Sequence, residues 1–407
     1  MHSTRIRALA STVVAVTMLA AQPVTTAQPQ TLATRVTVTF SKDVAPLLNK
    51  NCVSCHRPGE IAPMSLTTFQ AARPWAKSIR KAVADRVMPP WYADPRHGEF
   101  ANDPRLSDAD VATLLAWVDS GAVEGDPRDL PAPLATADGW TLGTPDLVVS
   151  MTAPAQVPAS GPRIIADYAI NPLEFREDTY IERMEVLPSN RTVTHHAIVN
   201  VNVKDGTGTQ RIGGYQPGGA TTTYPAGLVR MIPKGASLAL NMHYNTKGTP
   251  QEDTTKIGLV LARGRIEKVV RTARSGSRQR EIAAGAANYE AVGTPYVFAE
   301  DTHIVSLLPR MNERGKDFRY TLVYPDGRSV VLLSVPRFNP DWQPSYVLKQ
   351  AIAAPKGSRL ETVAHFDNSA ANKHNPDATQ RVVFGPEIMN GYFDYTVDGH
   401  TPTRTAR

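Results

Sequence analysis

The segment TVTHHAIV, residues 192–199, decides the fold of most of this 407-residue chain. It is short and rich in Val, Ile and Thr, and a second apolar segment, LALNMHY, follows at residues 238–244. Such runs, separated by Gly, Pro, Asn and Asp turns, predict β-strands. Others lie at residues 256–261, 303–308, 318–324 and 329–335. The pattern predicts two all-β antiparallel sandwiches, residues 146–275 and 276–407.

Three histidines lie on the first two of these strands. His195 and His196 are adjacent, and His243 stands near the end of the second strand. Because neighbours on a strand point to opposite faces, a metal shared by the adjacent pair requires a bulge or a strand end there. Three neutral imidazoles suit copper or zinc. By spacing alone, three unrelated histidines remain the alternative.

Upstream, the only two cysteines of the chain stand in CVSCH, residues 52–56. Cys52 and Cys55 in this spacing, followed directly by His56, form the attachment pattern of a covalent c-type haem, with His56 as an axial ligand. A local disulfide and a CxxC metal or redox site are the competing interpretations. The adjacent histidine favours the haem.

The residues around this motif predict a small all-α, class I-like cytochrome c at residues 36–127. Ser41 is expected to cap a helix that runs to Cys52. A second helix is expected to begin at Ser107, with Asp110 completing a capping box, and to stop at Gly121.

The sixth ligand of such a haem iron is a Met, a His or solvent. Met88 stands in VMPPW, residues 87–91, where prolines stiffen the loop that would present its thioether. Met64, which follows a proline, is the alternative.

The N-terminus, residues 1–27, reads as a cleaved secretory signal. Arg5 and Arg7 precede a short apolar stretch at residues 8–21, which ends in small residues. An uncleaved anchor is the alternative. No later segment is apolar enough to cross a membrane, so we expect a periplasmic or secreted protein. A Pro- and Ala-rich linker, residues 128–145, is expected between the haem-binding region and the sandwiches.

The charge of the chain and its distribution limit the classes of binding partner that we expect. The chain carries a formal charge of +6, yet its Lys and Arg residues form no run beyond scattered pairs. A nucleic-acid partner is therefore not expected.

The motifs together resemble the copper type II ascorbate-dependent monooxygenases, the relatives of peptidylglycine α-hydroxylating and dopamine β-monooxygenase, in their bacterial form with an N-terminal cytochrome c. The resemblance rests on VTHH at residues 193–196, NMHY at 241–244, GW at 139–140, GTPDL at 143–147, RGKDF at 314–318, DNSAAN at 367–372 and GYFDY at 391–395. It implies two eight-stranded, jelly-roll-like sandwiches, each with one copper. It also implies an electron-transfer copper bound by His195, His196 and His243.

The family's second, O2-activating copper does not carry over. Its ligand positions are occupied here by Arg310, Asn312 and Ile388. A guanidinium has no lone pair to donate and repels a cation, Asn is a poor copper ligand, and Ile is none. The side chains left to rebuild this site are those of His365, His374 and Met389.

Three functions follow from these residues. The first is an exported redox protein with a haem and one copper, which serves a periplasmic electron-transfer partner. The second is an active copper monooxygenase, fed by the haem and acting on a small-molecule substrate. The third is an anion-binding module, in which Arg310 and Asn312 hold a carboxylate or other anion in the old substrate cleft. An internal salt bridge of Arg310 to Glu313 or Glu387 is the alternative for that side chain.

Overall fold

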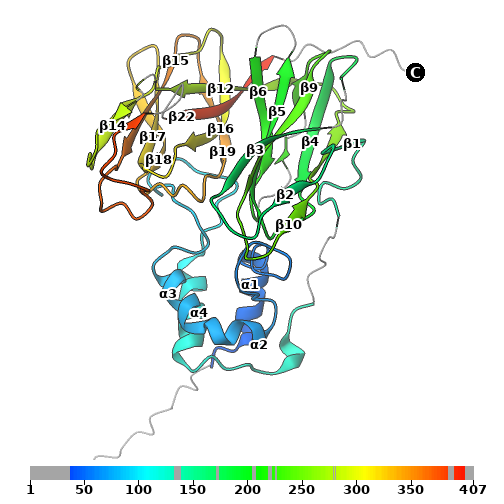
Figure 1. Ribbon diagram of the computed structural model, residues 1–407, viewed down its shortest axis with the longest axis vertical. Helices are drawn as coiled ribbons and strands as arrows, with labels where there is room; N and C mark the ends of the chain where they lie inside the picture. Colours follow the sequence, from blue (N-terminus) through cyan, green and yellow to red (C-terminus); the bar gives the residue numbers. More distant parts are fainter. Residues whose placement is uncertain are drawn as a thin grey trace, which may run out of the picture. The chain divides into compact units, whose positions relative to one another are not determined.

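The computed structural model describes residues 37–132, 139–170, 174–203, 208–218, 222–224, 227–277, 279, 281–383 and 389–398 (Figure 1). The expected signal segment 1–27, part of the expected linker and Ile388 lie outside these residues. Within them, no helix is both long and apolar enough to cross a membrane.

The helical elements of the described chain come before residue 130. They are η1 (Phe40–Val44), α1 (Ala45–Asn51), α2 (Phe69–Ala72), η2 (Arg73–Trp75), α3 (Ala76–Ala84), α4 (Asp108–Asp119) and η3 (Pro127–Asp129). The capping box of α4 is confirmed, because Ser107 accepts from the Asp110 amide while the Asp110 side chain accepts from the Ser107 amide. The helix stops before Gly121, whose φ is 96°.

The expected cap at Ser41 is wrong. Ser41 lies inside η1, and the residue before the helix is Thr39, whose amide donates to Asp43 Oδ2 at 2.8 Å. The acidic side chain one turn in satisfies the helix start, so the serine hydroxyl is not needed there.

A separate hydrophobic core holds these helices together. Phe40 lies against Phe69 and Trp117, with ring centroids 5.6 and 6.0 Å apart, and Leu48 and Leu114 are fully buried beside them. Burying such side chains contributes roughly 1.5–3 kcal/mol each. The assignment of this region to a cytochrome c stays a prediction.

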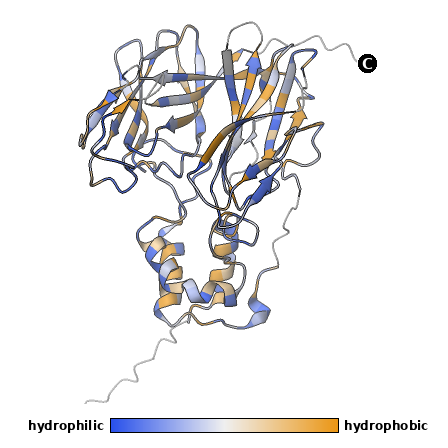
Figure 2. Ribbon diagram, in the orientation of Figure 1, coloured by the Kyte–Doolittle hydropathy of each residue, from blue (hydrophilic) through white to orange (hydrophobic). Residues whose placement is uncertain are grey.

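The first sandwich consists of two four-stranded layers. One layer has the order β1 (Leu147–Ser150), β11 (Lys256–Leu261), β4 (Thr179–Leu187), β8 (Leu228–Ile232). The other has the order β3 (Ile164–Ala169), β9 (Ser237–Tyr244), β5 (Thr194–Val203), β6 (Gly208–Tyr215). Alternate residues of β9 are buried, and both layers contribute to one apolar cluster. Figure 2 shows hydrophobic and hydrophilic residues mixed along the strands in this way.

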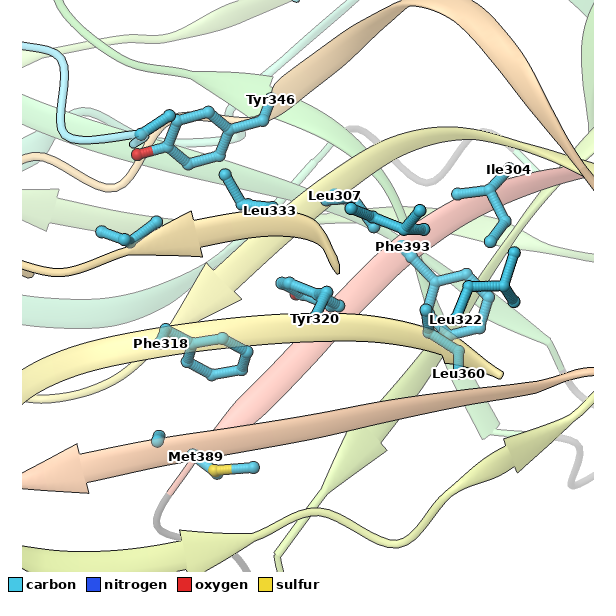
Figure 3. Packing of buried hydrophobic residues seen from close by; sticks show 14 of the residues in the cluster. Ile304, Leu307, Phe318, Tyr320, Leu322, Leu333, Tyr346, Leu360, Met389 and Phe393 are labelled. Carbon is cyan, nitrogen blue, oxygen red and sulfur yellow. The ribbon is translucent and has the colours of Figure 1, made fainter. Parts of the chain in front are cut away.

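The second sandwich repeats this arrangement. One layer has the order β12 (Lys268–Gly276), β22 (Asn390–Asp398), β16 (Thr302–Arg310), β19 (Tyr346–Ala354). The facing layer has the order β14 (Tyr289–Val292), β20 (Arg359–Phe366), β17 (Gly315–Val323), β18 (Ser329–Val335). Phe318, Tyr320 and Phe393 from the two layers meet in the core (Figure 3).

Short strands complete the sheets. They are β2 (Ala155–Val157) with β10 (Gln251–Asp253), β13 (Glu281–Ile282) with β21 (Val382–Val383), β7 (Thr222–Thr223) on β4 and β15 (Tyr296–Val297) on β20.

Two features tie the regions of the chain together. Strands β8 and β12 pair in parallel, so one layer runs continuously through both sandwiches. In addition, Trp91 and Phe100, which lie in the expected cytochrome region, pack into the core of the second sandwich, and Phe100 forms a β-bridge with Leu348. The chain around residues 91–100 therefore packs with the strands rather than with the helices.

Candidate metal and haem sites

A β-bulge brings the histidines to one side of the first sandwich. In the pairing of β5 with β9, Thr194 lies opposite Tyr244 and His196 lies opposite His243, so the register shifts at His195. An extra residue in one strand turns its neighbour's side chain toward the same face. The bulge that the adjacent pair requires is thus present.

The three imidazoles are in contact. The Nδ1 atoms of His195 and His196 face each other at 2.8 Å. Two nitrogens that bind one metal at about 2.0 Å each, roughly at a right angle, stand about this far apart. The rings of His196 and His243 stack with centroids 3.7 Å apart. His243 Nε2 lies 2.8 Å from Asn241 Oδ1, which leaves its Nδ1 for a metal.

The ligand set is close but not yet assembled. No three His, Cys, Asp or Glu side chains of the described chain are already arranged around a metal position. The stacking of the His196 and His243 rings accounts for the missing arrangement, because the nitrogen lone pairs of stacked rings do not point at one common position. A rotation of His243 about its side-chain bonds is the adjustment that three-fold ligation requires. The residues present therefore fit a metal such as copper in number and type, and their position fits only after this rotation.

The surroundings keep these histidines neutral. Burial lowers the pKa of His195, with Arg163 adding to the effect, to about 4. Burial followed by the charge of Arg310 lowers the pKa of His243 to about 4, and the same two causes lower that of His196 further. Neutral imidazole is the form that binds a metal, so protons do not compete at neutral pH.

Sequence reasoning missed two residues beside the histidines. Asn241, which bonds His243, stands two positions before it, so the period of a strand could have placed both on one face. Asp341 comes from a distant loop. Its Oδ1 accepts from Arg163 Nη2 at 2.8 Å and lies 4.0 Å from His195 Nε2, and no local pattern indicates this.

Two residues at the predicted ligand positions of the second copper, Arg310 and Asn312, lie in different surroundings. Arg310 ends β16 and lines a small cleft that it shares with His195 and His196. Asn312 lies past the strand, in a turn, where its Oδ1 accepts from the Arg314 amide at 3.0 Å.

Of the three side chains considered for rebuilding a second site, Met389 and His365 are engaged elsewhere, whereas the imidazole of His374 lies close enough to Asp341 to help lower the pKa of that carboxyl. Met389 is 1% exposed and lies in the second sandwich's core (Figure 3). His365 contacts Asp317 through Nδ1 at 2.8 Å and Glu290 through Nε2 at 3.4 Å. His374 is a loop residue whose amide donates to Asn372 Oδ1 at 3.0 Å.

The CVSCH motif begins where α1 ends. Cys52 follows the last residue of the helix, and both cysteines are free thiols, so the local disulfide is not formed here. Burial, with Cys55 adding to it, raises the pKa of Cys52 to about 12. His56 Nδ1 lies 3.3 Å from the Met64 carbonyl oxygen, and burial lowers the pKa of this imidazole.

A large cavity opens in front of this motif. Its volume is about 1230 Å³, and it is lined by both cysteines, His56, Met64 and Met88. Usual ligand pockets hold roughly 300–1,000 Å³. The space, the two thiols and the oriented histidine fit a covalently bound haem.

One short segment lies between the two candidate sites. Gly218 packs so closely on the motif that a Cβ atom there would stand 2.4 Å from Cys55 Sγ. Gln216 and Pro217 line both the cavity and the small cleft at the histidines. Tyr215, the last residue of β6, pairs with Ala197, which directly follows His196.

Comparisons with known proteins add little to this geometry. No family model matches the chain, and no curated protein matches it. Among solved structures, the major capsid protein P2 of bacteriophage PM2 is similar at a TM-score of 0.28 and 8% identity, over 64% of this chain and 99% of that one. The infectious bursal disease virus VP2 subviral particle is similar at a TM-score of 0.22 and 11% identity, over 62% and 72%. Likenesses this slight carry no statement about function.

Proposed function

We propose that this chain is an exported electron-transfer protein with a covalent c-type haem and one copper bound by three histidines. Both groups supply one-electron redox chemistry, and a periplasmic redox protein is the expected partner. The observation that carries the proposal is the segment Tyr215–Gly218, because it touches the haem-attachment motif at one end and the histidine site at the other.

The haem would be attached at Cys52 and Cys55 and held by His56. The contact of His56 Nδ1 with the Met64 carbonyl fixes the imidazole and leaves Nε2 for the iron. The Met64 and Met88 side chains both line the cavity, and either thioether would supply the sixth ligand; we propose Met88, because its loop is stiffened by Pro89 and Pro90.

The copper would be held by His195, His196 and His243. Asn241 orients the third imidazole, and the low pKa values keep all three able to donate a lone pair. Arg310 and Arg163 stand close enough to lower these pKa values, so the site carries positive charge around a cation. Copper bound by these histidines would supply one-electron redox chemistry, with the arginine charges partly offset by Asp341 beside His195.

The alternative, an active copper monooxygenase, requires a second metal. The contacts of the remaining candidates favour electron transfer instead, since the Met389 thioether packs in the core and His365 is paired with carboxylates. Arg310 presents a cation where that metal would bind.

The first test is the copper-to-haem ratio of the exported, haem-loaded protein, measured by elemental analysis. We expect one copper per haem, which is lost in His243→Ala. A ratio near two would overturn the single-site proposal and favour the monooxygenase. A protein without haem would overturn the assignment of Cys52 and Cys55.

A matched pair of glycine variants tests the connecting segment. Gly218 and Gly248 have positive φ values of 68° and 81°, so a side chain strains the backbone at both. Only at Gly218 would the new Cβ meet Cys55; at Gly248 it would meet nothing within 4 Å. We expect Gly218→Ala to slow reduction of the copper by the haem in flash-photolysis kinetics, and Gly248→Ala to leave the rate unchanged. Equal rates in both variants would remove the segment from the pathway.

A further inference from the structure

The cavity in front of the haem motif is also bounded by a group of basic side chains. Arg211 of β6 and Arg310 of β16 line it, and so does Asp394 of β22. Arg230 of β8 pairs with this carboxylate. These residues come from both sandwiches and meet where β8, β12 and β22 adjoin.

The carboxylate of Asp394 is already satisfied. Arg230 Nη2 donates to its Oδ1 at 2.9 Å, and Thr272 Oγ1 donates to the same oxygen at 2.6 Å. Ser306 Oγ donates to Oδ2 at 2.8 Å. One acid therefore balances one of the three guanidinium groups.

The other two guanidinium groups make no hydrogen bond and no ion pair in the described chain, although the charge of Asp394 acts favourably on Arg211. Arg310 donates no hydrogen bond there and forms no ion pair, and the same holds for Arg211, whose buried Nε has no acceptor. Burial lowers the pKa of Arg310, with Arg211 adding to the effect, to about 9, so Arg310 stays charged at neutral pH. The surface that these side chains retain faces the cavity that both line.

We propose that Arg211 and Arg310 form a binding site for a carboxylate group inside this cavity. Two half-buried cations that lack an ion-pair partner destabilise the fold, and an entering anion would offset this cost. A guanidinium binds a carboxylate through two parallel hydrogen bonds. Apolar walls, including Trp91, Ile212 and Leu348, suit an organic acid with an apolar body rather than an inorganic ion.

Such a carboxylate has two sources. It is either a propionate of the haem, in which case the site rests on the proposed function, or a small free carboxylic acid, in which case it does not. Both share one chemistry, and calorimetry on the full chain as purified distinguishes them.

The first measurement is a titration with hexanoate, with hexanol as the neutral control. If a free acid fills the site, the protein binds hexanoate and not hexanol. Arg310→Gln and Arg211→Gln then weaken binding at least tenfold, and Arg310→Lys retains part of it. Arg319→Gln, an exposed arginine on β17, leaves binding unchanged. If the chain carries no haem, this titration alone decides the matter.

If the haem-loaded protein binds no hexanoate, the reduction potential of the haem gives the second readout. A propionate held by these residues predicts a lower potential in Arg310→Gln and in Arg211→Gln than in the parent and Arg319→Gln, because a positive charge near the iron is removed. No hexanoate binding together with unchanged potentials would overturn the proposal.

A stability measurement separates binding from folding. Where hexanoate binds, so that no propionate fills the site, Arg310→Met in the protein without added ligand removes a half-buried charge that lacks an ion-pair partner, and its Tm is expected to rise or to stay the same. A fall in Tm, as when an internal ion pair is broken, would contradict the vacant-site interpretation.

Discussion

The two sandwiches have the same layering but differ at the strand ends that line the clefts. In the first, the start of β5 and the end of β9 carry three neutral imidazoles, with His196 in contact with both His195 and His243. In the second, β16 ends in a charged guanidinium, followed by a buried Met311 and a turn built on Asn312. The same scaffold therefore carries two different sets of residues at these ends, for which we propose a metal-binding role in the first sandwich and an anion-binding role in the second. The residues at the ends decide between them, while the cores need only apolar packing.

The largest loss of stability is expected on replacing Asp394, because its carboxylate is the ion-pair partner of Arg230. Asp394→Asn leaves Arg230 buried without its carboxylate, which costs about 3–5 kcal/mol of stability. Urea denaturation checks this value. Asp398→Asn, on the same strand but in an exposed pair with Lys268, serves as the control and is expected to change little.

The same variant has a defined pH dependence. Burial raises the pKa of Asp394, but Arg230 and the hydrogen bonds from Thr272 and Arg230 outweigh it and hold the pKa below its ordinary 3.8. The carboxylate therefore stabilises the fold fully above pH 3.8, and this contribution disappears as the pH falls through the folded-state pKa. The gap between parent and Asp394→Asn should be constant above that pH and narrow below it. A gap that widens in acid would contradict the ion pair.

A smaller effect, on copper affinity, is expected from replacing Asn241 of the first sandwich. Without its contact to His243 Nε2, the imidazole loses its fixed orientation, so Asn241→Ala is expected to weaken copper affinity about 10–100-fold. Competition with a chelator measures this. Asn200→Ala, on the neighbouring strand β5, is the control; a similar loss there would mean that the strands, and not the hydrogen bond, matter.

The smallest effect, on copper content, is expected from replacing His365 of the second sandwich. Because its two nitrogens contact Asp317 and Glu290, His365→Ala is expected to leave the copper content unchanged. Elemental analysis checks this. A loss of copper would give the second sandwich a metal role and end the contrast between the two.

Local patterns predicted much of the fold. The strands around residues 192–199 and 238–244 form as expected, and the α4 capping box is present. The register of β5 shifts at His195, which is the bulge that His195 and His196 need in order to share a face. The metal and haem assignments built on these residues stay predictions.

Contacts between distant segments could not be predicted. Arg211, Arg230 and Asp394 come from three strands that meet only in the folded protein, and nothing near any of them in sequence indicates the others. The same holds for Trp91, whose prolines suggested a haem loop but whose ring packs against Tyr346 at a centroid distance of 4.7 Å.

The parallel pairing of β8 with β12 has a consequence for ligand entry. One hydrogen-bonded layer passes through both sandwiches, so a hinge motion between the two halves would have to break the pairing of β8 with β12. A ligand of the cavity is therefore expected to fit a space that is already formed, with little closure of the protein around it. Selectivity would then depend on the size and shape of the guest, and heating should melt both halves in a single cooperative transition.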